Sequence, residues 1–215
     1  MEHQLAVPGE RDSGFTLLEM VISMMIVAVA LALLAPVYIV VSTSSARSQE
    51  ISAANGAIRP ALILLNNQVA STGTLYSPCA SGTNAGSIPA CSSGGGNAPS
   101  GWAVLLYFEA TSGTAAECSQ WRVYNGLLQD RTWNPASPPS SLSFTTLAPT
   151  VTITNTSGNQ PFALGSSTGS GTDLLVVDFY VSTGAKGAPS IETKTAVAAQ
   201  GQPSGTCSPP PTSGD

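Results

Sequence analysis

The sequence predicts an α+β fold: a long N-terminal helix joined to a globular head with an antiparallel β-sheet. Residues 15–41 form an apolar run in which Glu19 is the only charged side chain, and apolar residues then recur at helical spacing as far as Val69. The rest of the chain is rich in Ser, Thr, Gly and Pro and contains short runs of Thr, Val and Ile. This composition is typical of an exported β-rich domain with long loops.

The apolar run is long enough to span a bilayer as a tilted helix. Pro36 lacks a backbone donor, so we expect it to kink or loosen this helix, although membrane helices often tolerate proline. The polar residues 42–45 mark the exit from the apolar environment.

Residues 42–70 continue as an amphipathic helix that packs on the head. Its apolar residues follow one another at offsets of 7, 4, 3 and 4, which places them on one face: Ile51, Ile58, Leu62, Leu65 and Val69. Gly56 and Pro60 weaken the helix, and we expect a bend near residues 59–60.

Residues 71–100 read as loop, and strands follow. Residues 120–124 and 127–130 flank Asn125-Gly126, which is the strongest short signal for a hairpin. The other expected strands are residues 102–109, 142–156 (interrupted at Pro149), 173–181 and 191–198. We expect these strands to form a meander with the helix across one face.

Four cysteines, Cys79, Cys91, Cys118 and Cys207, favour disulfides in an exported domain and allow three connectivities. The simplest pairing joins Cys79 to Cys91 across a short Gly/Ser-rich loop, worth about 3 kcal/mol in the chain-entropy view. The remaining pair then joins Cys118 to Cys207. A metal site is disfavoured, because the chain has no C-x-x-C pair and its one histidine is His3.

Glu19 needs a partner if it lies in lipid, where a carboxylate costs about 2.5–3.5 kcal/mol at the centre of a helix and less near its end. Cleavage between Gly14 and Phe15 would create an α-amine one helical turn away. Such an amine has a pKa of about 7.7–8.0 and is largely protonated at neutral pH.

Gly14 after a hydrophilic leader, then Phe15, Glu19 and an apolar helix with Pro36, resemble the type IV prepilin family, which includes pilus subunits and pseudopilins. The resemblance implies that a prepilin peptidase cuts after Gly14 and methylates Phe15, and that Glu19 neutralises the terminal amine of a neighbouring subunit. The head is similar to larger minor pilins and J-type pseudopilins. The leader departs from the usual basic pattern, because it contains three acidic residues and only Arg11.

The resemblance also implies a segment order, a location and partners. The expected segments are a leader (1–14), a membrane and assembly helix (15–41), an amphipathic helix (42–70), a β-rich head (71–199) and a Pro/Ser-rich tail (200–215). The helix lies in the inner (cytoplasmic) membrane before assembly, with the head outside the cytoplasm, and other pilin or pseudopilin subunits are its partners. We expect no cofactor.

An enzyme is disfavoured, because His3 lies in the leader and its removal leaves no histidine for a catalytic triad. The carboxylate pairs Asp173/Asp178 and Glu109/Glu117 read as solvated surface groups. The formal charge of −5 at pH 7 disfavours direct nucleic-acid binding. The main alternative is a membrane-tethered binding module that presents Trp121 or Trp133 to a glycan, although core packing is commoner for such rings.

Overall fold

The computed structural model describes residues 16–76, 78–79, 100–109, 115–156, 158–166, 173–184, 189–200 and 205–207. Within these ranges the chain forms one α-helix and ten β-strands, which confirms the α+β class. The chain divides into two compact units, Met1–Ala46 and Arg47–Asp215.

The helix α1 spans Leu17–Ser71, so that it begins in the first unit and ends in the second. Pro36 and Pro60 both lie within it, and neither ends the helix.

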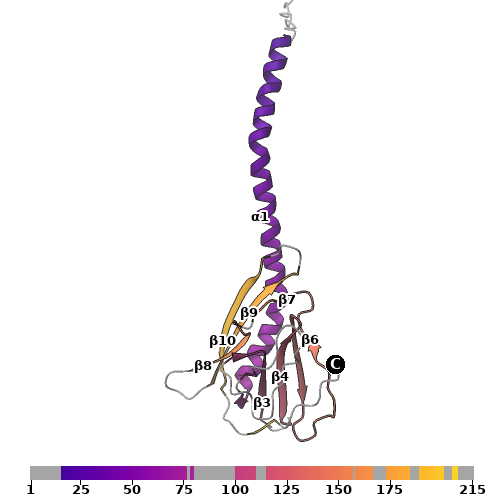
Figure 1. Ribbon diagram of the computed structural model, residues 1–215, viewed down its shortest axis with the longest axis vertical. Helices are drawn as coiled ribbons and strands as arrows, with labels where there is room; N and C mark the ends of the chain where they lie inside the picture. Colours follow the sequence, from indigo (N-terminus) through magenta and orange to yellow (C-terminus); the bar gives the residue numbers. More distant parts are fainter. Residues whose placement is uncertain are drawn as a thin grey trace, which may run out of the picture. The chain divides into compact units, whose positions relative to one another are not determined.

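The second unit contains two antiparallel sheets (Figure 1). The first sheet has the order β1-β3-β4-β5-β6, and the second has the order β10-β9-β8-β2, with β7 also paired to β9. The first-sheet strands are β1 (Thr74–Leu75), β3 (Ala103–Phe108), β4 (Glu117–Tyr124), β5 (Leu127–Trp133) and β6 (Thr145–Thr146). The second-sheet strands are β2 (Ser100–Gly101), β7 (Thr152–Ile153), β8 (Phe162–Ser166), β9 (Asp173–Ser182) and β10 (Ile191–Ala198).

The expected single meander is therefore wrong, and the chain crosses between sheets at Trp102. Gly101 pairs with β8 in the second sheet, whereas Ala103 pairs with β4 in the first. Trp102 and Ala103 also exchange backbone hydrogen bonds with Cys79, at 3.0 and 2.8 Å. A Cβ on Gly101 would collide with the Cys79 carbonyl, so the close approach of these two segments requires glycine.

The Asn125-Gly126 hairpin is confirmed. Asn125 and Gly126 have φ angles of 51° and 74°, as a type I′ turn requires, and they join β4 to β5. The Gly126 carbonyl also accepts a 2.7 Å hydrogen bond from the backbone N–H of Ile153. The hairpin turn of the first sheet is thereby attached to β7 of the second.

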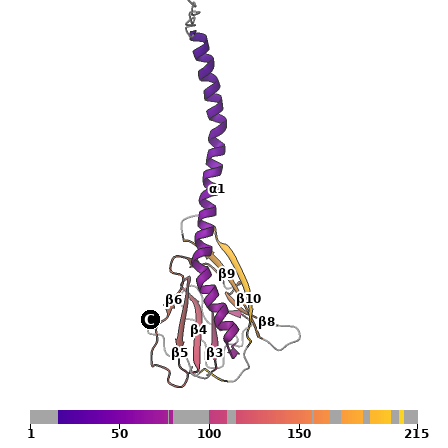
Figure 2. The same cartoon turned by 180° about the vertical axis from the view of Figure 1, so that it is seen from behind.

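The main core lies between the C-terminal part of α1 and the two sheets, and Figure 2 shows this part of the helix crossing β3 and β4. The predicted helix face is largely correct, because Ile58, Leu65 and Val69 are buried and Ile51 and Leu62 are half-buried. The helix also buries Ala54 and Ala61, which are not part of the predicted apolar face. Small side chains at these positions allow the helix backbone to approach the sheets closely.

A second core cluster, called here the outer cluster, covers the opposite face of the first sheet. It contains Cys79, Ala103, Leu105, Cys118, Trp133 and Cys207, with Tyr76, Tyr107 and Leu142 packed against it. The first sheet is therefore buried on both faces, which explains why β3 has no alternation of apolar and polar residues.

Candidate functional site

The N-terminus of α1 is closed by a side-chain cap. Thr16 precedes the helix. Its Oγ1 and its carbonyl oxygen both accept the backbone N–H of Glu19, at 3.3 and 3.0 Å. Thr16 and Glu19 have the spacing of a capping box, in which a Thr is followed three residues later by a Glu. The Thr-x-x-Glu spacing alone predicts such a cap, which is not among the expectations drawn above from the sequence.

Glu19 lies in the first turn of α1, where the helix dipole favours a carboxylate by about 0.3–1 kcal/mol. It is the only charged residue between Thr16 and Ala46. An acid at this position is therefore compatible with helix formation, and its side chain is exposed.

The apolar part of α1 is exposed. Its large side chains from Leu17 to Val41 are each at least half exposed, and Pro36 is exposed among them. Among the described residues, α1 is the one helix long and apolar enough to cross a membrane, with a mean hydropathy of 2.8 over its best window. Ser42 and Thr43, just beyond this part, donate hydrogen bonds to the Ile39 carbonyl at 3.0 Å each. Their hydroxyls are thus satisfied within the helix where the apolar stretch ends.

Two of the expected site residues, Gly14 and Phe15, lie outside the described residues, as does Cys91. Cleavage and methylation at the Gly14–Phe15 junction therefore remain predictions.

Cys118 and Cys207 form a disulfide with a Cα–Cα distance of 5.9 Å, and both residues are fully buried. The Tyr76 hydroxyl accepts a 3.0 Å hydrogen bond from the Cys207 backbone N–H, which holds residues 205–207 on the outer cluster. Cys79 is also disulfide-bonded. Its expected partner, Cys91, lies outside the described residues, so the Cys79–Cys91 pairing stays a prediction.

The tryptophans considered for ligand binding are buried. Trp121 has no exposed surface and Trp133 is only 4% exposed, so neither presents a ring to a glycan. Trp121 instead faces α1, where its Nε1 donates a 2.7 Å hydrogen bond to Gln68 Oε1. The same oxygen accepts a 3.0 Å hydrogen bond from Ser119 Oγ. These contacts assign Trp121 to the interface between helix and sheet.

Two buried arginines stack on Phe144 beside the outer cluster. The guanidinium carbon of Arg122 lies 3.4 Å from the Phe144 ring centroid, and that of Arg131 lies 4.3 Å from it. Cross-strand glutamines accept hydrogen bonds from both: Gln129 from Arg122 at 2.7 Å, and Gln120 from Arg131 at 2.7 and 3.0 Å. This arrangement holds the segment after β5 on the sheet, and it is not among the features expected from the sequence.

The carboxylates considered above for catalysis are either exposed or paired with a lysine. Glu109 and Glu117 are exposed, and Asp178 forms a 3.3 Å ion pair with Lys194. In the part of the chain that the structure describes, no group of three or more His, Cys, Asp or Glu residues is placed to hold a metal ion.

Comparison with known proteins gives one match. Residues 11–35 match the prokaryotic N-terminal methylation motif, a segment that includes Thr16, Glu19 and the first half of the apolar stretch. No curated protein and no solved structure matches the chain.

Proposed function

We propose that the protein is a pilin-like precursor, held in a membrane by the apolar part of α1, and that it acts as a subunit of a type IV pilus or of a secretion-type pseudofilament. The match of residues 11–35 to the prokaryotic N-terminal methylation motif supports this proposal. The observation that carries this proposal is Glu19, a lone carboxylate in the first turn of an exposed apolar helix. We infer a structural role from this motif.

In the proposed mechanism, a prepilin peptidase removes residues 1–14 and methylates the amine of Phe15. Thr16 then becomes the second residue of the mature chain, so its cap on α1 is retained. The apolar helix leaves the lipid and packs with neighbouring helices, where Glu19 offsets the terminal amine of an adjacent subunit. The head then primes, caps or decorates the filament, as in minor pilins or J-type pseudopilins.

Substitution of Glu19 tests this proposal. Leaving a buried amine unpaired costs about 3–5 kcal/mol, by analogy with breaking a buried ion pair. Glu19→Ala should therefore be processed and stay in the membrane, but it should be missing from sheared filament fractions. Glu19→Asp keeps the charge with a shorter reach and should assemble at an intermediate level.

Glu50→Ala is the matched control, because Glu50 is an acid of the same helix beyond the apolar stretch, and this variant should assemble normally. If Glu19→Ala assembles as well as the parent, Glu19 is only part of an anchor. The tethered binding module would then be the better description.

A further inference from the structure

Strand β10 forms the long edge of the second sheet. It stands at the end of the order β10-β9-β8-β2, and among the described strands it pairs with β9 alone. It has eight residues, whereas β2 at the other end of this order has two. A strand with one unpaired side is a template for pairing with another strand. We call this open side the β10 edge.

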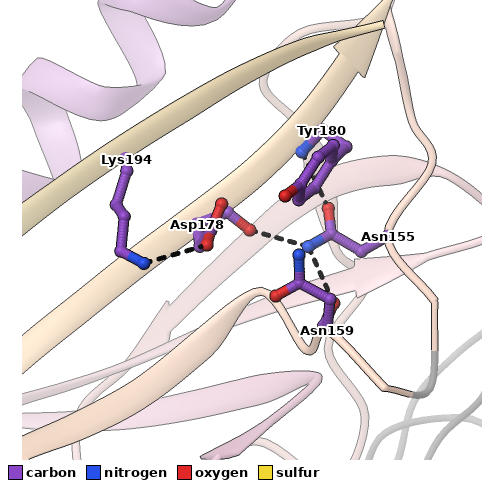
Figure 3. A network of polar contacts seen from close by, with 5 residues as sticks. All are labelled: Asn155, Asn159, Asp178, Tyr180 and Lys194. Atoms are coloured by element: carbon purple, nitrogen blue, oxygen red, sulfur yellow. Dashed lines mark hydrogen bonds and ion pairs between the residues drawn. The ribbon is translucent and has the colours of Figure 1, made fainter.

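The opposite side of β9 pairs with β7 and β8, and a side chain continues this pairing between them. Asn155 Nδ2 donates a 2.7 Å hydrogen bond to the Asp178 carbonyl, and its Oδ1 accepts a 3.0 Å hydrogen bond from the Tyr180 N–H (Figure 3). The Asp178 N–H donates to the Pro161 carbonyl at 3.0 Å, and the Tyr180 carbonyl accepts from the Thr154 N–H at 2.7 Å. The backbone groups of Asp178 and Tyr180 therefore point away from β10.

This arrangement determines which backbone groups of β10 are open. Along an antiparallel strand, the N–H and C=O groups of successive residues point to alternate sides. Phe179 lies between the two β9 residues just described, so its backbone groups point towards β10, where they meet those of its pairing partner Thr193. The backbone groups of the neighbours of Thr193, which are Glu192 and Lys194, then lie on the β10 edge.

The side chains of these two residues carry opposite charges. Both are exposed on the face of the second sheet that points away from the main core, whereas Ile191 and Val197 pack against that core. Lys194 forms a 3.3 Å ion pair with Asp178 on β9. The β10 edge thus presents an acid and a base two residues apart, on the same face and with open backbone groups.

We propose that two copies of this chain pair through their β10 edges, antiparallel and with Thr193 opposite Thr193 of the second copy. In this register Glu192 of each copy lies opposite Lys194 of the other, and the two exchange backbone hydrogen bonds. Opposite charges in directly opposed positions stabilise a strand pair. A shift by two residues in either direction places Lys194 opposite Lys194, or Glu192 opposite Glu192, and like charges there are destabilising. The charges therefore select one register.

The proposed pairing alternates charge across four strands. Each row runs from Asp178 through Lys194 to Glu192 of the second copy, so that the ammonium group lies between two carboxylates. On the other face, Thr193 meets its own counterpart in a pair of β-branched residues, which suits a strand.

The pairing also has a direction. Its two-fold axis is perpendicular to the sheet, so it reverses the part of α1 that packs on the sheets. Subunits of one filament repeat head to tail and share one direction. The β10 edge of a filament subunit therefore suits contact between two filaments rather than between neighbours in one.

Cysteine cross-linking of the full chain in excess detergent tests the register. The described residues include no free cysteine, so an added thiol has no competitor among them. Thr193→Cys places two thiols in directly opposed positions, with Cβ atoms about 4.5–5.5 Å apart, and should give a disulfide-linked dimer under mild oxidation. Thr195→Cys is the matched control, because Thr195 is half-buried on the same face but lies opposite Ile191. This variant should stay monomeric.

Charge exchange tests the pairs, with dimerisation measured by analytical ultracentrifugation in the same detergent. Glu192→Lys and Lys194→Glu each turn two attractive pairs into repulsive ones and should weaken dimerisation about tenfold. An equimolar mixture of the two variants should restore it, because the opposed side chains then carry opposite charges again. Glu109→Lys, an exposed site outside β10, is the control and should dimerise like the parent. Thermal unfolding of each variant checks that the head remains folded.

A monomer at every protein concentration overturns the proposal, as does equal cross-linking of Thr193→Cys and Thr195→Cys. A mixture that dimerises no better than either charge variant alone also overturns it. Because the protein is solubilised and unassembled in these experiments, their outcome is independent of whether the chain enters a filament.

Discussion

Trp121 Nε1 donates a 2.7 Å hydrogen bond to Gln68 Oε1, and this contact joins the centre of the first sheet to α1. Trp121 is fully buried, and so is Ser119, which donates to the same oxygen. A single acceptor on the helix therefore satisfies two buried donors on β4. The spacing of these donors fixes the register of α1 on the sheet.

Gln68→Ala should destabilise the head. It removes the shared acceptor, and each buried donor left without a partner costs about 1–3 kcal/mol. We expect a total loss of about 2–4 kcal/mol, measured by thermal unfolding of the full chain in detergent. Asn67→Ala, one residue away on an exposed face, should unfold like the parent, and an equal loss in both variants would contradict the assignment.

Gly126→Ala should weaken the link between the two sheets. The φ angle of 74° disfavours a side chain, and a Cβ there would lie 2.7 Å from Thr152 Cγ2. We expect a loss of about 1–3 kcal/mol. Adding Thr152→Ser removes the methyl group in the way and should restore part of the stability. Gly158→Ala is the control, because nothing lies within 4 Å of its Cβ position.

Asp130→Asn should stabilise the protein at neutral pH. Partial burial raises the pKa of Asp130 above its ordinary value of 3.8, against a smaller opposing effect of a backbone hydrogen bond. A carboxyl whose folded pKa is raised favours the folded state while protonated, and this advantage is lost as the pH rises through the folded pKa. The gain from Asn should thus be present at pH 7 and vanish below about pH 4. An equal gain at pH 3 and at pH 7 would contradict this assignment.

Removal of the Cys118–Cys207 disulfide should cost stability and release the segment that it holds. The bond closes a loop with a sequence separation of 89, worth about 4–5 kcal/mol in the chain-entropy view. Cys118→Ala/Cys207→Ala should unfold at a lower temperature than the parent and show faster hydrogen exchange at residues 205–207. Unchanged exchange there would mean that Tyr76 alone suffices to hold the segment.

Processing at Gly14 should be visible by mass spectrometry. The mature protein should begin with N-methyl-Phe15, and Gly14→Leu should leave the full-length precursor in the membrane. Gly9→Leu changes a glycine in the same leader and should be processed normally. A retained Met1, or a cut beyond residue 41, would contradict the prediction.

Features encoded in local sequence were predicted well. The helical spacing identified Ile58, Leu65 and Val69, and the Asn125-Gly126 pair identified the hairpin, because both signals depend only on near neighbours. Glu19 likewise stands out, since it interrupts an apolar run. The Thr16 cap is encoded equally locally, because it depends only on a Thr followed three residues later by a Glu.

The division of the strands into two sheets could not be predicted from local sequence. Trp102 lies between two residues that belong to different sheets, and nothing local distinguishes that position from the middle of a strand. Strand β8 was not predicted, because Gly165 and Ser166 lower the β-propensity of its sequence. The strand is stabilised by its pairing with β9, which local sequence does not reveal. Some structural roles depend on contacts that form only on folding, as do those of Gln68, Asn155 and Arg131. The residue types alone suggest that these side chains are exposed.

The Cys118–Cys207 bond also determines how the head responds to mechanical force. Tension on the chain beyond Cys207 passes covalently into β4, which is hydrogen-bonded to β3 on one side and to β5 on the other. A central strand cannot be peeled from a sheet one bond at a time, as an edge strand can, so many hydrogen bonds must share the load and break together. While the disulfide is intact, a pull at that end should leave the head folded up to forces that would already strip β6 or β10 from its sheet.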